Sequence, residues 1–211
     1  GEKIASKYGV ETEKTLTGFK FIGEKVAKYE KTQAKNYVFG YEESYGSLIK
    51  PFVRDKDAPQ ACLMLAEAAC FYKAQGKTLV DVLNGLYAEL GYYKESQTSL
   101  TLKGQKGALR IKEILDTLRK DKPAQIGGTA VAAIEDYQEA TREENGVIAA
   151  LEGFSRSNVL KYYLADGSWI AIRPSGTEPK CKFYYCIKGT SAQDAEAKTE
   201  VMQKAIADLV A

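Results

Sequence analysis

The stretch Arg-Pro-Ser-Gly-Thr-Glu-Pro-Lys that begins at Arg173 combines the groups that bind a phosphate monoester. Arg173 supplies a planar fork matched to phosphate oxygens, and Ser175 and Thr177 supply hydroxyl donors. Gly176 lets backbone N–H groups approach an anion without a Cβ in the way, and Lys182 adds positive charge. Composition alone leaves a polar hairpin turn as the alternative, because Pro, Ser and Gly are ordinary turn residues.

A second segment, Gly-Tyr-Glu-Glu-Ser-Tyr-Gly at residues 40–46, places two carboxylates and a hydroxyl between glycines. Carboxylates accept hydrogen bonds from neighbouring sugar hydroxyls, and each takes two donors at once. This segment is therefore a candidate for sugar binding. The alternative is a solvated acidic turn.

The chain contains no His, so acid–base work must fall to a carboxylate, Lys or Tyr. The place to look is the charged run Arg-Asp-Lys-Asp at residues 54–57, whose one lysine is Lys56. It would steady a phosphosugar as a cation, or pass a proton if its pKa is lowered. The alternative is a salt-bridged surface turn with Asp57 near the N-cap of the next helix.

These segments resemble motifs of the α-D-phosphohexomutases, the phosphoglucomutases and phosphomannomutases. The stretch from Arg173 resembles the phosphate-binding loop of their last domain, and residues 40–46 resemble the sugar-binding loop of their third domain, with the pattern Gly-Glu-x-Ser-Gly. Thr17 and Gly18 resemble a further loop that faces the sugar, and Lys56 matches a lysine that reaches into the active site. The resemblance implies these substrate-binding residues: Thr17, Gly18, Glu42, Ser44, Arg173, Ser175, Gly176, Thr177 and Lys182.

The chain departs from the family pattern at two positions. Tyr41 stands where many members have Gly, and Gly46 stands where some phosphomannomutase-type members have a His. The second departure leaves the proton-transfer role proposed for that His unfilled.

Within the family, the motifs resemble those of bacterial phosphoglucomutases most closely. The resemblance implies interconversion of glucose 1-phosphate and glucose 6-phosphate through a phosphoserine enzyme, a bisphosphorylated sugar and Mg²⁺. Neither the phosphoserine loop nor the magnesium loop occurs in these residues, so we expect this chain alone to be inactive. The alternatives are a phosphomannomutase or phosphopentomutase-like relative and a phosphosugar-binding module without catalysis.

Hydrophobic periodicity predicts two domains. Residues 1–103 read as an α/β domain, and residues 104–211 as an α+β domain with helices on one face of an antiparallel sheet. The opening helix has no strand before it, so we expect a start inside the family's third domain. The predicted helices are 1–8, 59–75, 78–91 (capped by Thr78), 109–118 and 191–210, and the predicted strands are 14–22, 36–40, 92–102, 130–138, 158–164, 168–173 and 181–187.

The Gly-Gln-Lys-Gly segment at residues 104–107 is the expected linker and hinge. A ligand bound to loops of both domains would favour a closed arrangement. The first two family domains are the expected partners of this chain.

Composition limits the other function classes. The net charge of +2 over 211 residues is too small to indicate nucleic-acid binding, and no apolar run approaches the length that spans a bilayer. Cys62, Cys70, Cys181 and Cys186 show no metal-ligand spacing and are expected to be reduced core thiols of a cytoplasmic protein.

Overall fold

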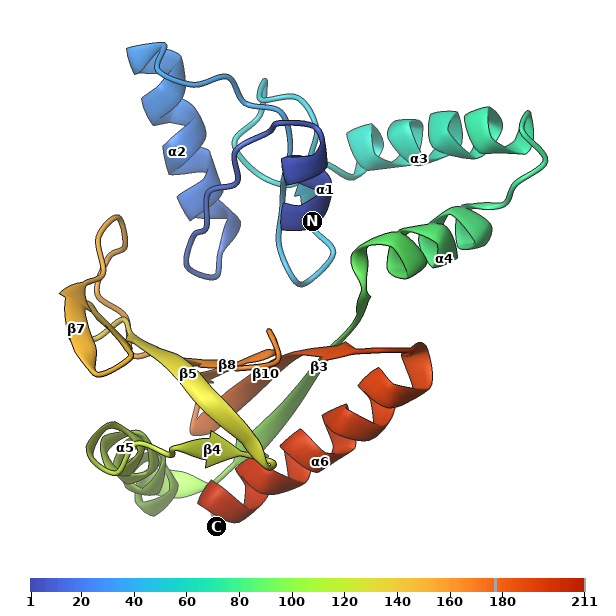
Figure 1. The fold of residues 1–211 in the computed structure, drawn as a ribbon. Coiled ribbons are helices and arrows are strands. Elements are labelled where there is room, and N and C mark those ends of the chain that lie inside the picture. The colour runs from blue at the N-terminus through green and yellow to red at the C-terminus, as the bar shows by residue number, and fades with distance from the viewer. Residues whose placement is uncertain (177, 211) are drawn as a thin grey trace. The chain divides into compact units, whose positions relative to one another are not determined.

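The computed structural model describes residues 1–176 and 178–210. The chain divides into two compact units, residues 1–90 and residues 91–211. Figure 1 labels the helices and most of the strands along the chain.

The second unit is organised by an antiparallel sheet in which each strand bonds to its neighbours in the order β3-β10-β9-β8-β5-β6-β7. A short strand, β4, pairs with β5 off this path. The strands are β3 (Tyr92–Thr101), β4 (Gln125–Ile126), β5 (Thr129–Asp136), β6 (Thr141–Glu144), β7 (Val147–Ala150), β8 (Leu160–Leu164), β9 (Trp169–Pro174) and β10 (Lys180–Gly189).

Helices α5 (Gly104–Lys120) and α6 (Ala192–Val210) cover one face of this sheet (Figure 1). Side chains alternate between the faces of a strand, so every second residue of β8, β9 and β10 enters the core beneath the helices. This core includes the following fully or almost fully buried side chains: Leu115, Leu160, Tyr162, Ile170, Ile172, Phe183, Ile187, Met202 and Ile206.

The first unit contains four helices and one short strand pair. The elements are α1 (Glu2–Lys7), α2 (Phe19–Thr32), β1 (Gly40–Tyr41), β2 (Ser47–Leu48), α3 (Ala58–Lys73) and α4 (Leu79–Leu90). Its buried side chains are few, among them Phe19, Val26 and Leu48. In residues 58–90, all of which the structure describes, neither α3 nor α4 has a buried residue.

The predicted strand at residues 14–22 is wrong, because helix α2 begins at Phe19. Phe19, Gly23 and Val26 are its buried residues, a spacing that places them on one face of a helix. Gly23 packs against the backbone of Arg54, since a Cβ there would lie 2.7 Å from the Arg54 carbonyl oxygen. The strand predicted at residues 36–40 is likewise reduced to Gly40–Tyr41.

The predicted domain boundary and linker also differ from the structure. Strand β3 belongs to the second unit, since all ten of its residues pair with β10. The residues expected to form a hinge instead begin helix α5 at Gly104. A Cβ at Gly107 would lie 2.2 Å from the Leu102 carbonyl oxygen, so these glycines allow a tight turn from β3 into the helix.

Candidate functional site

The predicted phosphate-binding loop connects β9 to β10, two strands inside the large sheet. Its backbone closes on itself, because the Ser175 N–H donates to the Lys180 carbonyl at 2.7 Å. The Ser175 hydroxyl accepts from the Glu178 N–H at 3.3 Å. A Cβ at Gly176 would meet nothing within 4 Å, so the space around it is open to a ligand. Thr177 lies outside the described residues.

Two cations of this site lie opposite each other across the strand pair. Arg173 pairs in register with Lys182, and the next pair, Ile172 and Phe183, is buried in the core. Alternation therefore directs both cations to the face of the sheet away from α5 and α6. Neither Arg173 nor Lys182 has an ion-pair partner among residues 1–176 and 178–210.

Several other cations of the same unit are paired with carboxylates. The ion pairs are Lys94 with Glu196 at 2.7 Å, Arg119 with Asp136 at 2.9 Å, Lys122 with Glu143 at 2.5 Å and Lys204 with Asp208 at 2.6 Å. The two cations beside the loop therefore keep their charge available for an anionic ligand.

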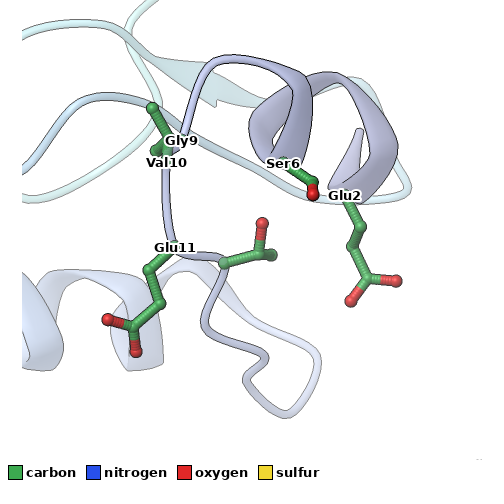
Figure 2. Close-up of a pocket in the computed structure, with 6 residues that line it drawn as sticks. Glu2, Ser6, Gly9, Val10 and Glu11 are labelled. Carbon is green, nitrogen blue, oxygen red and sulfur yellow. The ribbon is translucent and has the colours of Figure 1, made fainter.

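A hollow of about 420 Å³ lies in the first unit and contains none of the predicted site residues (Figure 2). Its carboxylates are already paired, Glu2 with Lys14 at 2.9 Å and Glu11 with Lys35 at 2.5 Å. A second hollow, of about 530 Å³, lies between α5 and the phosphate loop and is lined by Ser175 and Gly176 among others. The loop is thus open to solvent on the α5 side as well.

The predicted sugar-binding loop is the turn of the β1–β2 hairpin in the first unit. The Glu42 N–H donates to the Gly46 carbonyl at 2.9 Å and closes the turn. The Ser44 hydroxyl donates to Glu42 Oε1, also at 2.9 Å, so the two predicted sugar ligands lie together. Glu43 is exposed, whereas Glu42 is half-buried.

Lys56 lies against this turn. A Cβ at Gly46 would lie only 2.6 Å from Lys56 Cδ and 2.9 Å from Glu42 Oε1. Lys56 Nζ donates to Asp55 Oδ1 at 3.0 Å and lies 5.9 Å from the centre of the Phe19 ring. The hydrogen bond to Asp55, its charge and that of Glu42 raise the pKa of Lys56. This direction supports the binding role of Lys56 and opposes the proton-transfer role, which needs a lowered pKa.

The third predicted segment lies at the start of α2. Gly18 precedes the helix with a φ of 123°, a conformation that favours glycine, and Thr17 is exposed beside it. Phe19 is buried, and its ring neighbours Lys56. The structure therefore connects three predicted segments of the first unit through Phe19, Lys56 and Gly46.

Sequence reasoning missed two residues of this region. Gln60 of α3 accepts hydrogen bonds from the backbone N–H groups of Lys50 at 2.6 Å and Ile49 at 3.2 Å, and so ties the chain after β2 to the helix. Tyr45, at the tip of the turn, has a φ of 68° and a side chain that is 99% exposed. No pattern in the sequence singles out Gln60, whereas the position of an aromatic residue directly after Ser44 is a signal that could have found Tyr45.

Among the described residues, no group of three or more His, Cys, Asp or Glu is arranged to hold a metal ion. The described helices include none that is both long and apolar enough to cross a bilayer. Cys181 and Cys186 are buried as expected, but Cys62 and Cys70 of α3 are exposed, because this helix has no buried face.

Two descriptions of one protein family match most of the chain. Residues 1–90 match "Phosphoglucomutase/phosphomannomutase, alpha/beta/alpha domain III", and residues 118–204 match "Phosphoglucomutase/phosphomannomutase, C-terminal domain". The first description confirms the predicted α/β class, and the antiparallel sheet with two helices on one face confirms the α+β class.

Curated relatives carry the same name. A phosphoglucomutase of Staphylococcus aureus (strain bovine RF122 / ET3-1) is 38% identical over 203 residues, which are 95% of this chain and 36% of that protein. A phosphoglucomutase of Staphylococcus haemolyticus is 37% identical over 87% of this chain and 33% of that protein. The chain thus spans about a third of the length of these relatives.

A solved structure shows the same fold. The open form of the exocytosis-sensitive phosphoprotein pp63/parafusin, a phosphoglucomutase from Paramecium, matches with a TM-score of 0.61 at 20% identity. The match covers 99% of this chain and 35% of that one.

Proposed function

The chain belongs to the phosphoglucomutase/phosphomannomutase family, of which it carries the third and C-terminal domains, and we propose that it is the substrate-binding part of a phosphoglucomutase. The whole protein would interconvert glucose 1-phosphate and glucose 6-phosphate in the cytoplasm. It would use a phosphoserine, a hexose bisphosphate and Mg²⁺, with the phosphoserine and the metal ligands outside this chain.

The sugar loop supplies the part of this reaction that must work in two orientations. The bisphosphorylated sugar turns around between the two phosphoryl transfers, so the site must hold it both ways. Glu42 and Ser44 would accept and donate hydrogen bonds at hydroxyls that lie between the two phosphorylated ends. Their mutual hydrogen bond at 2.9 Å keeps the carboxylate and the hydroxyl together before a sugar arrives.

The phosphate loop would supply the second set of substrate contacts. Arg173, Lys182, Ser175, Gly176 and Thr177 would hold the phosphate that is not being transferred. Their contribution is positioning and neutralisation of charge, since the phosphoryl group itself moves to and from a serine elsewhere. Lys56, Thr17 and Gly18 would steady the sugar phosphate from the first unit.

The observation that carries this proposal is the pair of cations Arg173 and Lys182. They lie opposite each other in register, on one face of the sheet and beside a loop with open space at Gly176. Neither has a carboxylate partner among the described residues, in contrast to the paired cations elsewhere in the unit. An unpaired Arg–Lys couple of this kind suits a phosphate dianion.

The test is Arg173→Ala in the whole protein that contains this chain. It should weaken binding of glucose 1-phosphate and of the bisphosphate by about 1.5–3 kcal/mol, the size of a charge-assisted contact. Arg173→Lys should restore only part of this, because Lys cannot form the bidentate fork. Arg110→Ala is the matched control, since Arg110 pairs with Glu113 on α5 at 3.6 Å.

Unchanged KM and kcat in both Arg173 variants would exclude the loop from phosphate binding. Assays on mannose and pentose phosphates separate a phosphomannomutase or phosphopentomutase-like relative from a phosphoglucomutase. This chain by itself should convert no glucose 1-phosphate, and measurable conversion would contradict the assignment of the phosphoserine to another part of the protein.

A further inference from the structure

Tyr45 is the residue of the sugar loop whose conformation and exposure the fold does not explain. Its φ of 68° lies in the left-handed region, and its side chain is 99% exposed. The left-handed region is unfavourable for an L-residue, and a bulky aromatic residue there is an outlier. A fully exposed ring buries no apolar surface and therefore does not stabilise the fold. Stability alone therefore favours glycine at this position.

The neighbours of Tyr45 are the groups proposed to bind sugar hydroxyls. Ser44 precedes it directly, and the Ser44 hydroxyl is bonded to Glu42 Oε1 at 2.9 Å. The turn is closed by the Glu42–Gly46 backbone hydrogen bond, so Tyr45 extends from the tip of a short, constrained loop. A carboxylate, a hydroxyl and an unused aromatic ring thus occur within four consecutive residues.

A pyranose matches this combination chemically. Its rim carries hydroxyl groups that bond to Glu42 and Ser44, while its C–H faces are apolar and pack against an aromatic ring. Tyr provides such a ring with little loss of conformational entropy, because its side chain has only two torsions to fix. Other exposed aromatic side chains of this unit, Tyr8 at 74% and Phe52 at 73%, are not part of this turn.

We propose that Tyr45 contacts the substrate, with its ring packed against a C–H face of the hexose whose hydroxyls Glu42 and Ser44 bind. This inference rests on the proposed sugar-binding role of the loop. The sugar covers the ring that the free chain leaves exposed, and the binding energy offsets the cost of the left-handed backbone.

The experiment compares three substitutions at this position in the whole protein. Tyr45→Asn removes the ring and keeps a residue that tolerates the left-handed region. It should weaken binding of glucose 1-phosphate about fivefold, the effect of losing one aromatic contact. Tyr45→Phe should stay within about twofold, because it keeps the ring. Tyr45→Gly should bind as weakly as Tyr45→Asn while the melting temperature stays level or rises.

Two controls separate this inference from the proposed function. Tyr8→Ala removes an exposed ring outside the loop and should leave the Kd unchanged, whereas Glu42→Gln should weaken binding through the loop itself. If Tyr45→Asn binds like the unaltered protein while Glu42→Gln weakens binding, the Tyr45 contact is wrong and the loop assignment stands. If neither variant changes the Kd, the sugar-binding role of the loop fails as well. A fall in melting temperature at unchanged Kd would assign the ring to packing within the longer protein and overturn the inference.

Discussion

The two candidate binding loops are supported in different ways. The phosphate loop joins β9 and β10, whose backbones pair over six residues, and all ten residues of β10 pair with β3 on its other side. The sugar loop joins β1 and β2, which pair over two residues each. It depends instead on side chains, namely the Gln60 amide, the Tyr37 hydroxyl that donates to the Leu48 carbonyl at 2.7 Å, and Lys56 packed over Gly46.

This difference indicates which interactions preorganise each site. The long backbone pairing of β10 with β9 and β3 fixes the positions of Arg173 and Lys182. Single exposed side chains near the two cations can therefore change without displacing them. A two-residue hairpin has little backbone support, so its geometry is set by a few named contacts. The phosphate loop should therefore be sensitive to damage in the core, and the sugar loop to the loss of individual hydrogen bonds.

The largest expected effect is in the core beneath the phosphate loop. Ile172 precedes Arg173 in β9, and its fully buried side chain points into the core beneath the helices. Ile172→Ala should destabilise the second unit by about 3 kcal/mol. The matched change Leu63→Ala, at a side chain of α3 that is 71% exposed, should cost less than about 0.5 kcal/mol. Urea unfolding of this chain, followed by amide hydrogen exchange in each unit, measures both.

If Ile172→Ala and Leu63→Ala lowered the free energy of unfolding equally, the two units would not differ in how strongly they depend on a buried core. In that case the first unit would have a core that the burial of its side chains does not reveal.

A smaller effect is expected at Gln60. Gln60→Ala leaves the N–H groups of Lys50 and Ile49 without their acceptor, and should destabilise the hairpin by about 1–2 kcal/mol. Hydrogen exchange at these two amides should accelerate while exchange in β9 and β10 stays constant. Gln75→Ala is the control, because the Gln75 amide donates to the carbonyl of Phe71 near the end of α3, away from the hairpin. Unchanged protection of the two amides would contradict the side-chain support of this loop.

Much of the second unit could be predicted from the sequence, because its patterns are local and strong. Residues 168–173 and 181–187 are short runs rich in apolar and aromatic residues and form β9 and β10, and the helix predicted at 191–210 is α6. Thr78 also caps α4 as predicted, since its hydroxyl accepts from the Asp81 N–H at 3.1 Å. The candidate phosphate site could be located in the same way, because all of its predicted residues lie within one short motif and the strand that follows it.

The failures arose where pairing between distant segments decides the outcome. Strand β3 was predicted but assigned to the wrong unit, because its partner β10 follows it by some eighty residues and pairing leaves no local signal. The residues from Thr15 to Ile22 alternate like a strand, yet burial of Phe19 and Gly23 against the Arg54 segment selects a helix. For the same reason, the proximity of Lys56 to the sugar loop is a product of tertiary packing and not of spacing.

The pH-dependent contribution of Glu13 should be confined to the first unit, which contains it and its partners. Burial alone would raise the pKa of Glu13, but hydrogen bonds from Lys25, Lys35 and Tyr29 outweigh it and lower the pKa to about 2. A lowered pKa means that Glu13 stabilises the folded unit above about pH 4.5 and loses this effect as the pH falls towards 2. For a partly exposed group the contribution is about 1 kcal/mol.

Urea unfolding at pH 6 and pH 3 measures this contribution. Glu13→Gln should reduce the stability difference between the two pH values for the first unit and leave the second unit unaffected. An identical pH dependence in the variant and the unaltered chain would show that the Glu13 network does not stabilise the fold.

The smallest effect is expected at Gly46. Gly46→Ala places a methyl group where Lys56 Cδ and Glu42 Oε1 now lie, at 2.6 and 2.9 Å from the new carbon. Both are atoms of flexible side chains, so they should move aside, and the affinity for glucose 1-phosphate should fall by less than about threefold. A loss as large as that of Glu42→Gln, measured by titration calorimetry on the whole protein, would show that Lys56 and Glu42 must keep these positions.

The four thiols of the chain provide a chemical readout of its two units. Cys62 and Cys70 lie exposed on α3, so an alkylating reagent should modify them within the folded protein. Cys181 is fully buried in β10, and burial raises its pKa to about 12, so at neutral pH it offers the reagent neither access nor thiolate. The rate of Cys181 alkylation, measured by mass spectrometry, would therefore report how often the strand that carries Lys182 opens, and so how long the candidate phosphate site stays intact.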